Sequence, residues 1–169
     1  MTHQEALIAV LKKSFADCWS RETSLDEEGW TPENPAYGHC AIASLIAQRV
    51  LGGELLRYDL KGTPYEHMRS HYRNRLPDGT VVDFTEAQFG ANAPVLPEPV
   101  VRAREEVLDQ VKYPKTAERY KLFSKRVRAW LDSFRNEKYF SHQSRNFGLF
   151  VFVRFKNPNK ADGLYLDIW

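Results

Sequence analysis

Three side chains far apart in the sequence have the types that nucleophilic catalysis requires. Cys40 stands where a polar segment gives way to the apolar run 41–47, which predicts a helix. The first turn of a helix exposes backbone N–H groups without intrahelical acceptors and so stabilises an anion such as a thiolate. His71 and Asp83 follow in the order of a Cys-His-Asp triad, with the imidazole as base, then acid, and the carboxylate orienting it. These residues predict acyl transfer through a Cys40 thioester, at an amide, peptide or ester bond.

The acyl intermediate of such a reaction also needs hydrogen-bond donors for its oxyanion. The backbone N–H of Cys40 is one candidate because it lies at the helix start. Asn34, in the preceding loop, and His39 are candidate side-chain donors, and Trp30 of the same loop is a candidate substrate contact. We expect a small molecule or a peptide as substrate.

The placement of His71 beside Asp83 depends on the register of a predicted hairpin. Its turn, Pro77-Asp78-Gly79, fits a type I turn followed by a glycine bulge, a three-residue loop. That loop pairs Arg73 with Asp83, which makes His71 and Asp83 diagonal neighbours on one face of the sheet. A two-residue turn would place them on opposite faces. An ion pair between Arg73 and Asp83 is the alternative use of this carboxylate.

Each of these residues also has a structural or metal-binding interpretation. Cys40 can be a buried thiol that begins a core helix, and His71 a hydrogen-bonded strand histidine. Zinc is a further possibility, but the chain lacks Cys-x-x-Cys pairs, and its His-x-x-x-His spacing suits a helix whereas the residues from 71 onward predict a strand. We therefore expect neither a metal nor a cofactor. The potential zinc ligands are His39, Cys40, His67, His71 and Asp83.

Hydrophobic periodicity and turn signals predict the elements that position these residues. The expected helices span 4–19, 40–51, 100–110 and 116–135, and the expected strands span 54–60, 71–76, 80–85, 149–155 and 164–169, the last two joined by a turn at 157–159. The 169 residues are most simply one α+β domain, 1–169, with a C-terminal helix and hairpin extension from about 130.

Composition limits the class of protein. Cys18 falls on the buried stripe of the first helix, and the N-terminus has no secretory pattern, so we expect two reduced cysteines and a cytoplasmic protein. No stretch is long and apolar enough to span a membrane. Segment 112–138 holds nine Lys or Arg and three acidic residues with interleaved aromatics. A nucleic-acid surface would look like this, but we favour the solvated face of an amphipathic helix and expect no nucleic-acid partner.

Residues 29–89 resemble the YunG-like family of small uncharacterised bacterial proteins. The resemblance rests on the segments 30–35, 38–40, 52–54, 70–76, 82–85 and 88–89, with 116–120 farther on. The order of helix-borne Cys, strand His and next-strand Asp is also similar to papain-like and transglutaminase-like enzymes. This similarity implies a central Cys-bearing helix packed on an antiparallel sheet. A papain-like module that binds its ligand without turnover is the alternative function.

Overall fold

The protein has an α+β fold in which one four-stranded antiparallel sheet packs on helices. The structure, a computed structural model, describes residues 2–140, 151–152 and 167–168. The helices are α1 (His3–Cys18), α2 (Cys40–Leu51), α3 (Arg104–Val107) and α4 (Pro114–Phe140), and the short 3-10 helices are η1 (Arg21–Thr23), η2 (Glu66–Met68) and η3 (Glu86–Phe89). The strands of the sheet are β1 (Glu54–Asp59), β2 (Ser70–Arg75), β3 (Val81–Val82) and β4 (Val100–Arg102), in the order β3-β2-β1-β4.

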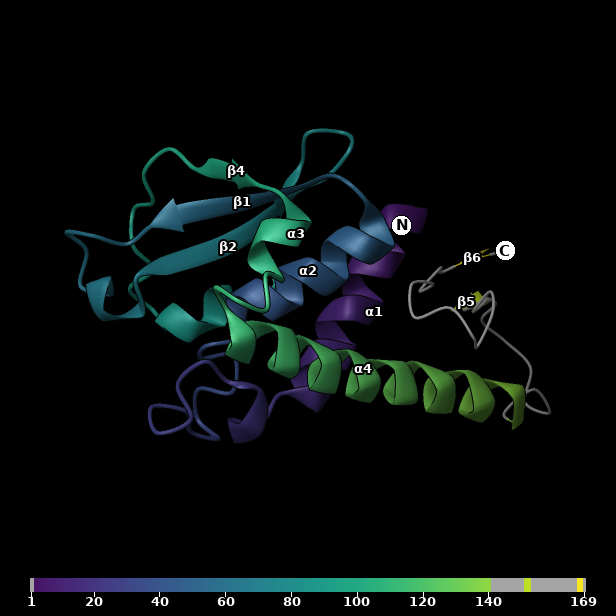
Figure 1. Cartoon of the computed structure of the whole chain (residues 1–169). Coiled ribbons are helices and arrows are strands. Elements are labelled where there is room, and N and C mark those ends of the chain that lie inside the picture. The colour runs from purple at the N-terminus through teal and green to yellow at the C-terminus, as the bar shows by residue number, and fades with distance from the viewer. Residues whose placement is uncertain (1, 141–150, 153–166, 169) are drawn as a thin grey trace.

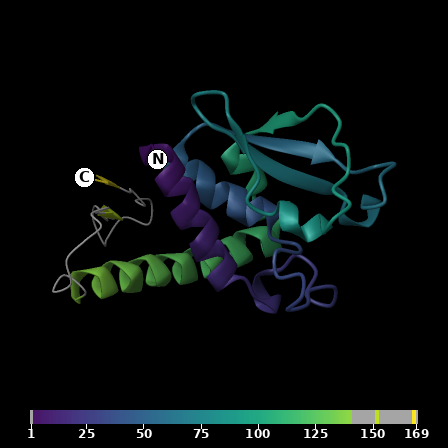
Figure 2. The same cartoon turned by 180° about the vertical axis from the view of Figure 1, so that it is seen from behind.

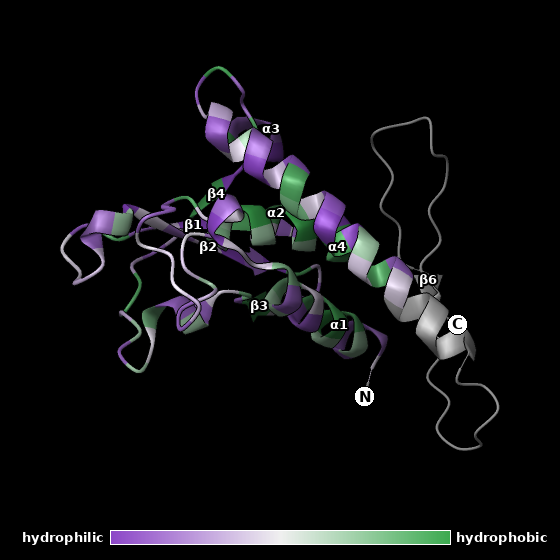
Figure 3. Cartoon of the chain, turned by 90° about the horizontal axis from the view of Figure 1, so that it is seen from below, coloured by the Kyte–Doolittle hydropathy of each residue, from purple (hydrophilic) through white to green (hydrophobic). Residues whose placement is uncertain are grey.

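Helix α2 lies at the centre of the molecule (Figures 1 and 2). It contacts β1 and β2 on one side and both α1 and α4 on the other, and α1 and α4 also contact each other. A helix covered on both sides must be apolar on nearly every face. In Figure 3, α2 is coloured mostly hydrophobic, whereas α4 alternates between polar and apolar residues. The predicted central position of the Cys40 helix is therefore confirmed.

The main core forms where α1, α2 and α4 meet the β2–β3 hairpin. The ring of Phe15 lies 5.4 Å from that of Phe84 and 5.5 Å from that of Phe123, measured between centroids. All three rings are buried, and fully burying an aromatic or large aliphatic side chain stabilises the fold by about 1.5–3 kcal/mol. Cys18 belongs to this core and is a free thiol, as predicted.

The hairpin between β2 and β3 has the predicted register. Asn74 pairs with Val82 and Arg75 with Val81, and the N–H of Leu76 donates to the carbonyl of Thr80 at 2.8 Å. The glycine of the Pro77-Asp78-Gly79 loop has φ +87°, the left-handed conformation that glycine adopts without strain. This register places Asp83 next to the strand that carries His71.

Two predicted elements differ from the structure. The helix expected over 100–110 is wrong at its start: Val100–Arg102 form β4, an edge strand paired antiparallel with β1, and only Arg104–Val107 are helical as α3. Pairing with β1 overrides the local helical spacing because β-branched valines fit a pleated sheet well. The strand expected over 80–85 is paired only at Val81–Val82, since the chain bends into η3 soon afterwards.

The C-terminal elements agree with the prediction as far as they are described. Helix α4 covers and extends the helix expected over 116–135. Val151–Phe152 and Asp167–Ile168 pair antiparallel as β5 and β6, as the expected second hairpin requires. Residues 149–150, 153–155, 157–159, 164–166 and 169 of that hairpin lie outside the described residues.

Candidate active site

Cys40 is the first residue of α2, and the turn before it is held tightly. Gly38 has φ +77°, and a Cβ atom there would lie 2.3 Å from Ser24 Oγ and 2.7 Å from the Leu25 nitrogen. The Leu25 N–H donates to the Gly38 carbonyl at 3.0 Å. This turn can therefore be made only by glycine, and it sets where the Cys40 side chain begins.

The N-terminus of α2 has no side-chain cap. Its N-cap residue is His39, whose ring makes no capping hydrogen bond, and the first intrahelical bond runs from the Ala43 N–H to the His39 carbonyl at 3.0 Å. The Cys40 N–H precedes that bond, so it remains one of the unpaired donors of the first turn. Such a donor can serve a developing anion beside the thiol.

His71 and Asp83 form the contact that the hairpin register predicts. His71 Nε2 lies 2.6 Å from Asp83 Oδ2, and the Arg73 Nε–H donates to the same oxygen at 2.8 Å. The other carboxylate oxygen, Oδ1, accepts from the Thr85 N–H at 2.8 Å. Asp83 therefore contacts both His71 and Arg73, so the ion pair with Arg73 does not exclude the contact with His71. Nε2 is thus held by Asp83, and the other ring nitrogen, Nδ1, lies 3.0 Å from the amide nitrogen of Gln88.

The Cys40 thiol acts electrostatically on this imidazole. Complete burial by itself lowers the pKa of His71, but the hydrogen bond to Asp83 and the interaction with Cys40, together with the negative charges on both, raise it to about 9. In Asp83, burial raises the carboxyl pKa, and the hydrogen bond and charge of His71 outweigh that effect and lower it. Cys40, His71 and Asp83 thus form one electrostatically linked group.

The Cys40 side chain is nearly enclosed. The residue is 9% exposed and His71 is fully buried. The sulfur lies 3.9 Å from the carbonyl oxygen of Ser70, at the start of β2. A ligand would therefore reach the sulfur only through a narrow opening, or after a local movement of the chain.

Gln88 is a partner of His71 that the chemistry of the sequence does not indicate. Its amide Nε2 lies 3.0 Å from His71 Nδ1 and 3.2 Å from Thr85 Oγ1, and the side chain is 3% exposed. The ring of Phe89 packs edge-on against the imidazole, with centroids 4.9 Å apart. Gln88 and Phe89 contributed to the family resemblance, but no spacing rule linked either residue to His71.

The three expected oxyanion or substrate contacts all support the loop before α2. The Asn34 amide donates to the Gln88 carbonyl at 3.0 Å, and the Trp30 indole donates to the Pro35 carbonyl at 3.0 Å. His39 is fully buried, with Nδ1 2.9 Å from the Tyr37 carbonyl and Nε2 2.8 Å from Thr23 Oγ1. Burial lowers the pKa of His39 to about 4, so its ring is neutral at physiological pH.

Arg119 of α4 is the second group that sequence reasoning missed. Its guanidinium is 8% exposed and donates to the Gly38 carbonyl at 3.0 Å and to the Thr23 carbonyl at 3.2 Å. The sequence places Arg119 in a basic segment that favoured a solvated face. Only the packing of α4 against the loop before Cys40 shows that this cation is buried.

Other expectations concerned the second thiol, metals and membranes. Cys18 and Cys40 are both free, and burial raises the pKa of Cys18 to about 11. Among the described residues, no three His, Cys, Asp or Glu side chains lie close enough together to hold a metal ion. No helix in that part of the chain is long and apolar enough to cross a bilayer.

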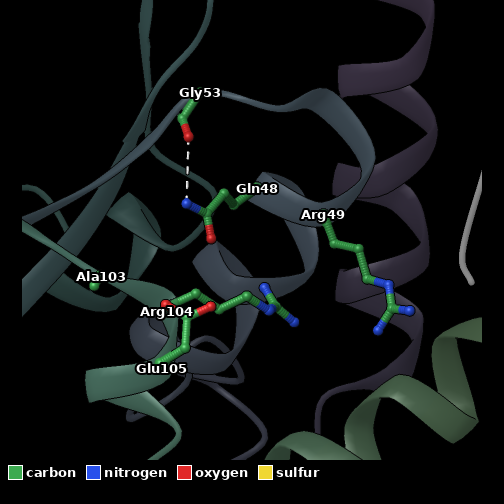
Figure 4. A pocket seen from close by; sticks show the side chains of 6 residues that line it. All are labelled: Gln48, Arg49, Gly53, Ala103, Arg104 and Glu105. Carbon is green, nitrogen blue, oxygen red and sulfur yellow. Dashed lines mark hydrogen bonds between the residues drawn. The ribbon is translucent and has the colours of Figure 1, made fainter. Parts of the chain in front are cut away.

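One surface pocket lies apart from these residues (Figure 4). It has a volume of about 640 Å³, at the C-terminal end of α2 beside α3. Its lining residues are Gln48, Arg49, Gly53, Ala103, Arg104 and Glu105. The Cys40 thiol does not open into it.

Fold and site together describe a small α+β protein with a cysteine at the start of its central helix and a His–Asp pair on the adjoining sheet. The model of the family described as YunG protein matches residues 7–132, so the chain belongs to the YunG family. It is 32% identical over 97 residues to the Uncharacterized protein YunG of Bacillus subtilis (strain 168), an alignment that covers 57% of this chain and 70% of that relative. No solved structure matches the chain. The resemblance to the family is thus confirmed, and the match ends close to where the C-terminal extension was expected to begin.

Proposed function

We propose that the protein is a cysteine-dependent acyl-transfer enzyme with a papain-like or transglutaminase-like arrangement of catalytic groups. The observation that carries the proposal is the His71–Asp83 hydrogen bond of 2.6 Å combined with the electrostatic contact between His71 and Cys40. A base held by a carboxylate and linked to a thiol at a helix N-terminus is the arrangement that activates a cysteine nucleophile.

The reaction follows from these positions. His71 Nδ1 takes the thiol proton before the substrate reacts, as the raised pKa of about 9 favours. The Cys40 thiolate then attacks the carbonyl carbon of an amide, peptide or ester through Sγ, moving an electron pair onto the carbonyl oxygen. The Cys40 N–H donates to that oxyanion. When the tetrahedral intermediate collapses, the leaving amine or alcohol takes the proton from Nδ1 and a thioester remains on Sγ. Water or another acceptor then gives its proton to Nδ1 and attacks the thioester, which releases Sγ as the leaving group.

Asp83 has two roles in this scheme. Its bond to Nε2 fixes the tautomer in which Nδ1 carries no proton, so Nδ1 can accept the thiol proton once the Gln88 amide, 3.0 Å away, releases it. The negative charge of Asp83 then stabilises the imidazolium formed in the first step. Arg73 and the Thr85 N–H hold the carboxylate in place. The side chains of Asn34 and His39 already have other partners, so in this proposal they support the loop and the Cys40 N–H is the donor to the oxyanion.

A thiol-labelling experiment tests the proposal. We would measure the rate of Cys40 alkylation by iodoacetamide against pH in the Cys18→Ala protein, with and without His71→Gln, and use intact mass to detect acyl adducts from activated esters. We expect labelling near neutral pH to slow at least about tenfold in His71→Gln, since a lost stabilisation of about 1.4 kcal/mol gives a tenfold change. His67→Gln is the matched control, because His67 is an exposed histidine four residues earlier.

Two results would contradict the proposal: a Cys40 that does not react in the native protein at any pH, or one that reacts equally fast in His71→Gln and in its control. The near-complete burial of Cys40 and His71 counts against turnover at this thiol, and the second function is then a module that binds its ligand without turnover. Saturable ligand binding with no acyl adduct at Cys40 would support that function.

A further inference from the structure

Arg119 is a buried cation that has no acidic partner among the described residues. In that part of the chain its guanidinium hydrogen-bonds to three neutral oxygens: the carbonyls of Gly38 and Thr23 and, at 3.5 Å, the hydroxyl of Thr116. No described residue hydrogen-bonds to its Nε. Within the described part of the chain, Arg119 makes no ion pair with a carboxylate, although it lines a second surface pocket together with acidic side chains such as Asp26 and Glu118. A buried charge is costly unless an opposite charge compensates for it.

One group of opposite charge acts on this guanidinium. Burial lowers the pKa of Arg119, and the negative charge of a Cys40 thiolate raises it. Arg119 donates to the Gly38 carbonyl, two residues before Cys40, so its guanidinium is held at the turn that leads into α2. His39 lies between Gly38 and Cys40 in the sequence, and its neutral ring supplies no charge of its own.

We propose that Arg119 is a positioning residue of the site, whose guanidinium fixes the turn before α2 and takes the Cys40 thiolate as its counterion. The inference rests on the proposed function in one respect, that Cys40 acts as a thiolate. It assigns to α4 a direct influence on the nucleophile: α2 supplies the thiol, β2 supplies the base, and α4 supplies a permanent positive charge.

Other titratable groups also face the sulfur and must be held constant in a test. His71 interacts with Cys40 from β2 through a hydrogen bond and charge, and Asp83 acts on the sulfur through His71. Tyr72, on the same strand, has its pKa raised by burial and, in part, by the charge of Cys40. These residues stay unchanged in the variants below, so a difference between variants reports the change at Arg119.

The test measures the thiolate directly. Thiolates absorb in the ultraviolet, so the difference between Cys18→Ala and Cys18→Ala/Cys40→Ala proteins gives the ionised fraction of Cys40 at each pH without requiring a reagent to reach it. The same titration is repeated with Arg119→Gln and Arg119→Lys. The matched control is Arg126→Gln, because Arg126 lies on the same helix and binds Ser20 and Glu22 of the neighbouring loop but not Gly38.

We expect Arg119→Gln to move the Cys40 titration to higher pH by about one unit, a tenfold change in the ionisation equilibrium, since even a buried charge in a protein acts at an effective dielectric constant of about 20. Arg119→Lys keeps the charge and should stay within about threefold of the parent protein, as should Arg126→Gln. A titration of Arg119→Gln that superimposes on its parent would overturn the inference.

A loss of stability in the Arg119→Gln variant would not leave the inference untested. If Arg119→Gln fails to fold, Arg119→Lys decides alone: a titration displaced by a full unit in a protein that retains the charge would overturn the inference. The absorbance titration is independent of the alkylation assay. An unreactive Cys40 whose titration still shifts in Arg119→Gln would contradict the proposed function and support the role of Arg119. A reactive Cys40 whose titration is unchanged in Arg119→Gln would support the function and overturn the role of Arg119.

Discussion

The Asp83–His71 hydrogen bond predicts a specific pH dependence of stability. The perturbation is Asp83→Asn, made in a Cys40→Ala protein so that the thiol does not titrate in the same range. In the parent, Asp83 keeps the pKa of His71 raised above its unfolded value of 6.5. In the variant, burial acts on the imidazole without this opposing carboxylate, and the pKa of His71 falls.

The sign follows from proton binding. A histidine whose folded pKa is raised binds more protons when native than when unfolded, so its stabilising contribution is complete below about pH 6.5 and is lost as the pH rises through the folded value, about 9 with Cys40 present. That full shift corresponds to roughly 3 kcal/mol. Cys40 supplies part of it, so without the thiol we expect a loss of about 1–3 kcal/mol over this range.

Urea unfolding of the two proteins between about pH 6 and pH 10 measures this loss. Groups common to both proteins cancel in the difference between their curves, including Cys18 and His39. The free-energy gap between parent and Asp83→Asn should be widest at the acidic end and should narrow by about 1–3 kcal/mol toward the alkaline end. Arg73 stays charged throughout, so its lost bond shifts the gap by a constant amount. Parallel curves would refute the assignment of a stabilised imidazolium to His71.

Two further predictions concern the scaffold that holds α2 on the sheet. Asn74 is fully buried and donates to the Ser44 carbonyl of α2 at 2.9 Å, so Asn74→Ala should lower the free energy of unfolding by about 1–3 kcal/mol in urea titrations; a change near zero would show that this bond does not hold α2 on β2. Gly53 and Gly62 both have positive φ, but a Cβ at Gly53 would lie 2.0 Å from the Arg75 carbonyl oxygen, whereas Gly62 faces open space. Gly62→Ala should therefore cost only about 1–2 kcal/mol for its backbone conformation and Gly53→Ala clearly more, and equal melting temperatures would contradict this comparison.

Local chemistry in the sequence was sufficient to predict much of the site's framework. The Pro77-Asp78-Gly79 turn sets a hairpin register through its own backbone preferences, and that register alone brings His71 to Asp83. The apolar run after Cys40 likewise predicts a central helix, because a helix without a polar face must be covered by other elements. The turn residues that set the hairpin register lie within a few positions of one another, and the central helix follows from the apolar residues along its own sequence.

Only the tertiary structure decided how the remaining polar groups are used. The spacing of apolar residues predicted a helix at Val100, but Val100 lies in β4 because the edge of β1 was available for strand pairing. Gln88 contacts His71, and Arg119 contacts the turn before Cys40, although each pair lies on elements far apart in the sequence. The ring of His39, a candidate donor to the oxyanion, hydrogen-bonds to Thr23 instead. The order of residues determines the local preferences of a turn or a helix. Which buried donor hydrogen-bonds to which acceptor depends on how whole elements pack, because a buried polar group without a partner is costly wherever it lies.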